Sequence, residues 1–113
     1  MKIVNLMENT PGVDGCLYEH GLSFYIETGH HKLLMDTGAS EATLVNARKL
    51  GIDLKAIDTV VLSHGHYDHS GGILAFVREN SHARIYMRRS AAMDYYHVDP
   101  DSCRYIGIDK RIL

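Results

Sequence analysis

Cysteine, tryptophan and long apolar runs are scarce in this chain of 113 residues, which has two cysteines and no tryptophan. Cys16 and Cys103 lie far apart in the sequence, so we expect neither a disulfide framework nor a cysteine metal site. No apolar stretch approaches the roughly 20 residues that cross a membrane, and Met1–Leu6 resembles a strand rather than a secretion signal. The sequence therefore predicts a cytoplasmic protein with no membrane partner and two inert thiols.

A strong net charge is also missing. Twelve lysines and arginines stand against fourteen acidic residues, for a net charge of -2, so we expect no nucleic acid partner. The one local basic cluster is Arg84, Arg88 and Arg89, and solvation at the surface explains it more simply than a partner does. Hydrophobic residues make up 45% of the chain, which predicts a packed core, and the length predicts one domain over residues 1–113.

Hydrophobic patterns predict strands that alternate with helices. Ser40 is expected to cap a helix that Gly51 ends. The run Thr59–Leu62 is apolar and rich in β-branched residues, which suits a strand buried on both faces. The expected strands cover residues 2–7, 22–27, 32–35, 59–62 and 83–87, and the expected helices cover residues 42–50, 73–79 and 90–96. This order predicts an α/β fold with layered sheet and helices.

The most informative feature is the segment 63–72, SHGHYDHSGG, which directly follows the buried strand. Imidazole and carboxylate are ligands of zinc, iron and manganese. Because His64 and His66 alternate, they can point the same way, whereas the adjacent Asp68 and His69 are expected to point apart and reach a second metal. Two metals that share an oxygen produce a hydroxide near neutral pH. A solvated histidine-rich loop is the alternative, and the buried strand and flanking glycines favour the metal site.

This segment resembles the His-x-His-x-Asp-His signature of the metallo-β-lactamase-fold hydrolases, and the preceding run 34–38, LMDTG, resembles that family as well. Residues 19–27, 46–47, 50–53 and 105–108 resemble, more narrowly, the dihydropterin ribofuranosyl-aminobenzene phosphate synthases. The resemblance implies the N-terminal half of an αββα sandwich, with a mixed sheet and helices on one face. It implies a metal-dependent hydrolase or related transferase that uses a metal-bound hydroxide on a small-molecule substrate, which in the narrow branch is phosphorylated.

The family pattern also implies roles for individual residues. His64 and His66 would bind a first metal, and Asp68 and His69 a second, with zinc as the expected ion and iron or manganese as alternatives. Asp68 would in addition be catalytic, because it would orient the nucleophilic hydroxide. Asp36 would hold the metal loop by hydrogen bonds from outside the ligand set, although aspartate at such a position also fills simple turns.

Two further residues, Glu19 and His20, precede an expected strand and belong to the narrower resemblance. They could line the substrate pocket, or they could make structural contacts, and the sequence leaves both interpretations open.

The family's site uses more ligands than this chain offers, because a third histidine, a bridging aspartate and a final histidine come from later strands. His97 is poorly spaced to replace one of these missing ligands, and a lone histidine is usually just an exposed residue. The alternative to an enzyme is therefore a truncated, inactive half-domain that binds metal weakly or not at all.

Half of a sandwich would leave one apolar face of its sheet open to water, which is a liability unless another molecule covers it. We therefore expect a homo-oligomer, most simply a two-fold dimer with a self-complementary apolar interface.

Overall fold

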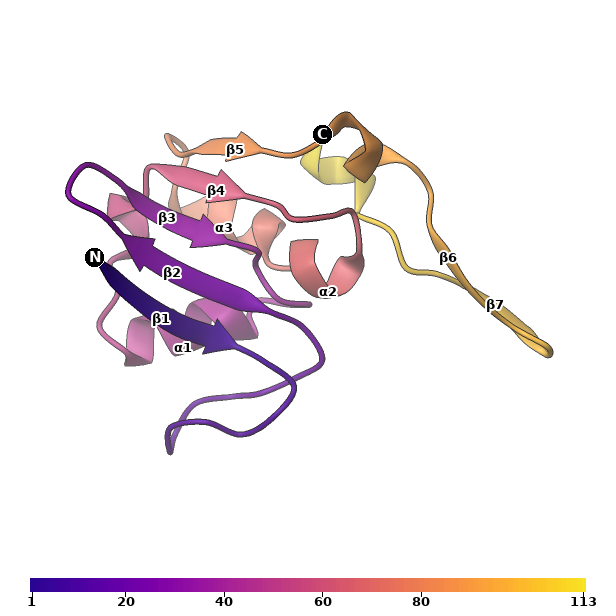
Figure 1. Ribbon diagram of the computed structural model, residues 1–113, viewed down its shortest axis with the longest axis horizontal. Helices are drawn as coiled ribbons and strands as arrows, with labels where there is room; N and C mark the ends of the chain where they lie inside the picture. Colours follow the sequence, from indigo (N-terminus) through magenta and orange to yellow (C-terminus); the bar gives the residue numbers. More distant parts are fainter.

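A five-stranded sheet with strand order β1-β2-β3-β4-β5 forms the body of the computed structural model, which describes residues 1–113 (Figure 1). β1 (Lys2–Met7) pairs antiparallel with β2 (Ser23–Glu27), which pairs antiparallel with β3 (Lys32–Met35). β4 (Thr59–Val61) runs parallel to β3, and β5 (Arg84–Tyr86) runs parallel to β4. The predicted mixed sheet is confirmed, and each predicted strand agrees with the observed one to within one residue at either end.

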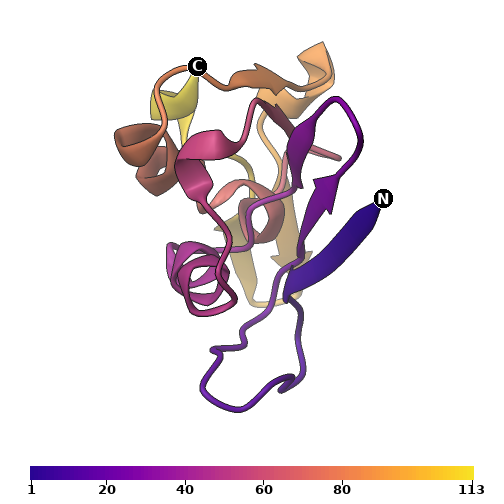
Figure 2. The ribbon, with the colours of Figure 1, turned by 90° about the vertical axis from the view of Figure 1, so that its left-hand side faces the viewer.

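Two helices, α1 (Ala42–Lys49) and α3 (Ile73–Glu79), cover one face of this sheet, as Figures 1 and 2 show. Leu44 of α1 and Phe76 of α3 join Val60 of strand β4 in one buried cluster. The predicted α/β fold with helices on one face is therefore confirmed. None of the helices has both the length and the apolar character that crossing a membrane requires.

Polar and glycine residues set the ends of α1 largely as the sequence predicts. Gly51 follows the helix with φ +77°, in the left-handed region that favours glycine. At the other end the N-cap position belongs to Glu41, one residue later than predicted. The hydroxyl of Ser40 nevertheless accepts a hydrogen bond from the backbone N–H of Ala42 at 3.1 Å, so it still satisfies one of the free donors of the first turn.

The opposite face of the sheet carries apolar side chains that no helix covers. Side chains alternate across a strand, so the residues that flank the buried positions share this second face. Ile3 is 60% exposed and Tyr86 is 53% exposed, although both are large and apolar. The side chains on this face, the open sheet face, are Ile3, Phe24, Ile26, Leu33, Met35, Val61 and Tyr86. The expected open apolar face is present.

After β5 the chain leaves the sheet and forms a smaller C-terminal unit. A 3-10 turn, η2 (Arg89–Ala92), leads into a hairpin of β6 (Tyr96–Asp99) and β7 (Ser102–Tyr105). A last 3-10 turn, η3 (Lys110–Ile112), follows it. The hairpin projects away from the body of the molecule (Figure 1), and all of its strand residues are exposed.

The helix predicted over residues 90–96 is wrong, since only the turn η2 forms there and the chain then extends into β6. Tyr96 lies opposite Tyr105 on the neighbouring strand, and the two rings meet edge to face with centroids 5.6 Å apart. Aromatic and β-branched residues favour strands when they pair across a hairpin. This cross-strand pairing within the hairpin outweighs the helical pattern of residues 90–96.

The long connection between β1 and β2 is held by one buried amide, that of Asn46 on α1. Its Nδ2 donates to the carbonyl oxygens of Leu6 and Leu17, each at 2.8 Å, and its Oδ1 accepts from the N–H of Leu17 at 2.7 Å. Both the nitrogen and the oxygen of the amide are therefore engaged in hydrogen bonds. The clamp fixes the part of the loop that leads into Glu19 and His20.

Candidate metal centre

The histidine-rich segment follows β4 at the carboxyl end of the parallel strands, where α/β sheets generally bind ligands. It turns through Gly65 and enters α2 (Tyr67–Ser70), a four-residue helix that the sequence pattern did not predict. A side chain at position 65 would overlap the backbone of Ala91, and one at Gly71 would overlap that of Ala39. Glycine is therefore required at both positions, because the segment packs directly on neighbouring backbone.

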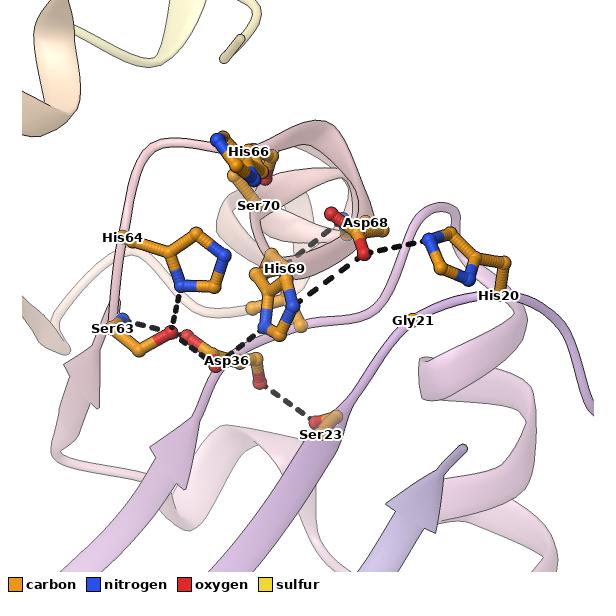
Figure 3. Close-up of polar contacts among 12 residues, drawn as sticks. His20, Gly21, Ser23, Asp36, Ser63, His64, His66, Asp68, His69 and Ser70 are labelled. Atoms are coloured by element: carbon orange, nitrogen blue, oxygen red, sulfur yellow. Dashed lines mark hydrogen bonds and ion pairs between the residues drawn. The ribbon is translucent and has the colours of Figure 1, made fainter. Parts of the chain in front are cut away.

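Three side chains of this segment converge on one point (Figure 3). One ligand atom each from His64, Asp68 and His69 lies within 4.8 Å of the others. Asp68 Oδ2 lies 3.5 Å from His69 Nε2, and the rings of His64 and His69 have centroids 4.1 Å apart. These distances are short enough for one cation to contact all three residues.

The structure groups these residues differently from the sequence prediction. The expectation that Asp68 and His69 point apart is wrong, because the two residues lie in the helical turn α2, not in extended chain. His66 lies outside the group of three. Its ring centroid is 4.6 Å from that of His64 and 5.4 Å from that of Tyr95, against which it packs edge to face. The assignment of His66 as a metal ligand stays a prediction.

Asp36, at the end of β3, connects the sheet to the metal segment. Its carboxylate is 1% exposed; Oδ1 accepts from the N–H of Ser63 at 2.7 Å, and Oδ2 accepts from the hydroxyl of Ser63 at 2.6 Å. Oδ2 also lies 2.8 Å from His69 Nδ1. The backbone φ of Asp36 is +58°, in the left-handed region, which aspartate tolerates better than most residues. The side chain thus links the sheet to the metal segment by hydrogen bonds, and its supporting role for a metal stays a prediction.

These hydrogen bonds determine which ring nitrogen carries the proton. The carboxylate of Asp36 only accepts, so His69 Nδ1 must donate to it, and in the neutral ring Nε2 keeps a free lone pair. The hydroxyl of Ser63 gives its single proton to Asp36 and therefore accepts from His64 Nδ1, 2.8 Å away. His64 Nε2 is then also unprotonated. Both histidines present the nitrogen that a metal needs.

The electrostatic surroundings favour the neutral form of His64. Partial burial of the ring lowers its pKa below the usual value, and the neighbouring imidazoles of His69 and His66 lower it further by repulsion of a second positive charge. A neutral imidazole is the form that binds a metal ion.

The donor set fits a divalent metal. In the neutral tautomer of His69, no proton lies between its Nε2 and Asp68 Oδ2, so two electron-rich atoms face each other at 3.5 Å. A cation between them would relieve that repulsion. Two nitrogens and one carboxylate oxygen are a zinc ligand set that leaves a fourth position for water or substrate, as catalytic zinc sites do.

The two residues predicted near a substrate pocket, Glu19 and His20, contact different parts of the structure. Glu19 Oε1 accepts a hydrogen bond from the hydroxyl of Ser40 at 2.8 Å, at the start of α1. His20 Nε2 lies 3.0 Å from Asp68 Oδ2, at the metal centre (Figure 3). Their role in substrate binding stays a prediction, but only His20 contacts a candidate ligand.

A cavity of about 300 Å³ opens beside the metal segment. His64, His66, Arg88 and Tyr95 are among the residues that line it. The guanidinium of Arg88 makes no ion pair, so its charge is available to a ligand. A larger cavity of about 710 Å³ is lined by none of the candidate ligands, whereas His64 of the converging group and the neighbouring His66 line the smaller one.

The sequence pattern assigned Arg88 to a solvated surface and missed its place beside His64. A signal was available, because Arg88 comes just after β5, the parallel neighbour of β4. The carboxyl ends of parallel strands meet at one edge of a sheet, so residues that follow adjacent strands converge there. Ser63 was likewise not singled out, although it stands directly before the first histidine.

Residues that were not expected to bind metal lie elsewhere. His97 lies on β6, where it pairs with Asp99 at 3.2 Å, and it is not one of the converging residues. Cys16 and Cys103 are both free thiols.

Comparison with known sequences gives a family match over most of the chain. Residues 18–101 match the profile of the Metallo-beta-lactamase superfamily. The chain is 38% identical over 85 residues to the 7,8-dihydropterin-6-methyl-4-(beta-D-ribofuranosyl)-aminobenzene-5'-phosphate synthase of Methanocaldococcus jannaschii, which covers 70% of this chain and 29% of that enzyme. It is also 38% identical over 96 residues to the uncharacterized protein MJ0448 of the same organism, covering 83% of this chain and 36% of that protein.

Comparison with solved structures agrees. The crystal structure of Tm1679, a metal-dependent hydrolase of the beta-lactamase superfamily, superposes with a TM-score of 0.74 at 38% identity and covers 96% of this chain and 37% of that chain. The chain thus spans about one third of the length of these relatives.

Proposed function

Because this chain belongs to the metallo-beta-lactamase superfamily, we propose that it acts as a metal-dependent hydrolase or related transferase. Membership supports hydrolase-type chemistry, and members typically bind divalent metals, often zinc. One observation supports the proposal at the level of residues: ligand atoms of His64, Asp68 and His69 converge within 4.8 Å. We propose zinc as the ion, with iron and manganese as alternatives, because the ligand set suits all three.

A divalent metal held by these residues would act as a Lewis acid and lower the pKa of water toward neutrality. Asp68 is our proposed catalytic residue. Its Oδ2 is engaged by His20, while no protein donor reaches its Oδ1, which can therefore accept a hydrogen bond from an attacking water and orient it. His66, beside His64, is proposed as a further ligand on the wall of the cavity.

The cavity supports a proposal on the substrate as well. Arg88, which lines the same cavity as His64 and makes no ion pair, suits an anionic group, and arginine binds phosphate in a two-pronged geometry. The similar synthase of Methanocaldococcus jannaschii is named for a phosphate-bearing product. We therefore propose a small-molecule substrate that carries a phosphate.

Replacing Arg88 by alanine should raise KM for a phosphorylated ester roughly tenfold or more, because a hydrogen bond to a charged group contributes about 1.5–3 kcal/mol. KM for the same ester without its phosphate should stay unchanged. Arg89→Ala is the matched control, since Arg89 is adjacent and exposed but does not line the cavity. Equal effects of the two variants, measured by steady-state kinetics, would remove Arg88 from the substrate site.

Metal content and turnover together test the proposed function. The chain should hold one or two metal ions tightly and hydrolyse a generic phosphodiester or thioester, and turnover should be lost after chelation and in His66→Ala. Substoichiometric metal and no turnover would instead support the alternative, a half-domain without activity.

We also propose that a second copy of the chain covers the open sheet face, in a two-fold dimer. Ile3 lies on that face and is 60% exposed, so Ile3→Lys should place a charge in the interface and shift the chain to monomer in sedimentation velocity. Val13→Lys is the control, because Val13 is equally apolar and 66% exposed but lies in the loop after β1. A monomeric wild-type chain at micromolar concentration would overturn the proposal.

The proposed location is the cytoplasm. Both cysteines are free thiols, which suits a reducing compartment.

A further inference from the structure

We propose that His20 is a positioning residue that holds the carboxylate of Asp68 toward His64 and His69. The proposal rests on the proposed metal function, but it concerns a residue outside the His-x-His-x-Asp-His segment. His20 lies 64% exposed at the end of the loop between β1 and β2, and its Nε2 is 3.0 Å from Asp68 Oδ2. An exposed histidine gains a fixed orientation only if other groups hold its ring.

Asn9 provides that second contact and determines which ring nitrogen of His20 carries the proton. The N–H of Gly21 donates to Asn9 Oδ1 at 3.0 Å, which identifies the other terminal atom of the amide as the nitrogen. That nitrogen lies 2.9 Å from His20 Nδ1 and must donate to it. The proton of the neutral imidazole is therefore on Nε2, the ring atom that lies 3.0 Å from Asp68 Oδ2.

The same arrangement argues against His20 as a metal ligand. One ring nitrogen accepts from Asn9, and the other carries the proton and faces Asp68 Oδ2 at 3.0 Å, so neither keeps a free lone pair. His20 also stands on the far side of Asp68 from His69 (Figure 3). Its effect on a metal must therefore pass through Asp68.

The backbone around His20 is locked to α2, so the contact is built into the fold. The N–H of Leu22 donates to the carbonyl oxygen of Asp68 at 3.2 Å, and the N–H of Gly38 donates to the carbonyl oxygen of Leu22 at 3.0 Å. A side chain at Gly21 would overlap that same Asp68 carbonyl oxygen. The segment 20–22 thus contacts both the main chain and the side chain of Asp68.

A residue that orients a metal ligand typically changes metal affinity 10- to 100-fold when it is removed. His20→Ala should weaken Zn²⁺ binding by about this factor, measured by competition with a chromophoric chelator, and should alter the visible spectrum of the Co²⁺-loaded chain. His20→Gln, whose amide can still donate to Asp68, should restore most of the affinity. Asn9→Ala should weaken binding only a few-fold, because it frees the ring but leaves its donor in place.

His82→Ala is the matched control, since this exposed histidine contacts no candidate ligand, and thermal unfolding of the metal-free variants checks that each one folds. Unchanged Zn²⁺ affinity and an unchanged Co²⁺ spectrum in His20→Ala would overturn the proposal. Equal loss in His20→Gln and His20→Ala would also overturn it, because a ring that is itself a ligand cannot be replaced by an amide.

A wild-type chain that binds no Zn²⁺ would overturn the proposed function, and a second measurement separates that outcome from a failure of the positioning role. Long-range proton–nitrogen spectra of the metal-free chain should show His20 as the Nε2–H tautomer. An Nδ1–H tautomer would overturn the hydrogen-bond chain whatever the metal result.

Discussion

Replacing Asp36 by alanine should destabilise the chain by about 3 kcal/mol and weaken Zn²⁺ binding 10- to 100-fold. The carboxylate is buried and is contacted by the N–H and hydroxyl of Ser63 and by His69, so its removal leaves three donors without an acceptor. Alanine also fits poorly at φ +58°, which adds about 1 kcal/mol. Chemical denaturation and chelator competition would measure the two effects.

Asp36→Asn separates the two roles of this residue. Asparagine tolerates the left-handed backbone and can still accept from the N–H of Ser63, so most of the stability should return. Its amide nitrogen would face His69 Nδ1 and force the proton onto Nε2, where it blocks the metal. Zn²⁺ affinity should therefore stay as low as in Asp36→Ala. An asparagine variant that binds Zn²⁺ like the wild type would show that the assigned tautomers are wrong.

Replacing His69 by alanine should reduce Zn²⁺ affinity by more than about 100-fold, beyond the range for residues that only support a ligand. His69 supplies one of the three converging ligand atoms and is itself fixed by Asp36. His66→Ala should cost less affinity, because His66 lies outside that group. Isothermal titration of the metal-free variants with Zn²⁺ would show which of the two substitutions lowers the affinity more.

Two exposed histidines serve as controls for that experiment. His82→Ala and His97→Ala should bind Zn²⁺ like the wild type, since neither residue belongs to the converging group. A larger loss in His66→Ala than in His69→Ala would mean that the metal sits on the His64–His66 side of the segment, and the three-residue site would then be wrong.

The sheet and the two covering helices could be predicted because their signals are local. Thr59–Val61 is a short β-branched run, and Ser40 and Gly51 mark the two ends of the first helix, so nearby residues alone indicate these elements. The hairpin could not be predicted in this way. Tyr96 meets Tyr105 across a turn of two residues, and the helical spacing of residues 90–96 gives no sign of that cross-strand contact.

The candidate site could likewise be predicted only in part. The motif identified the residue types, but α2 is only four residues long and is held by tertiary hydrogen bonds, from the N–H of Tyr67 to Ile106 and from the N–H of Thr37 to His69. Those contacts turn Asp68 and His69 toward each other, against the expectation for extended chain. The contacts of Asp36 with Ser63 and of His20 with Asp68 likewise join segments that only the folded sheet brings together.

The outer edge of β1 has a consequence for how the chain behaves in concentrated solution. β1 is the first strand of the sheet, so one row of its backbone N–H and C=O groups has no partner strand. Its run Ile3–Met7 carries no charge, and an uncharged strand at an open edge is a template for aggregation. Lys2 and Glu8 flank the run and act as gatekeepers. We therefore expect removal of either charge to promote fibril growth.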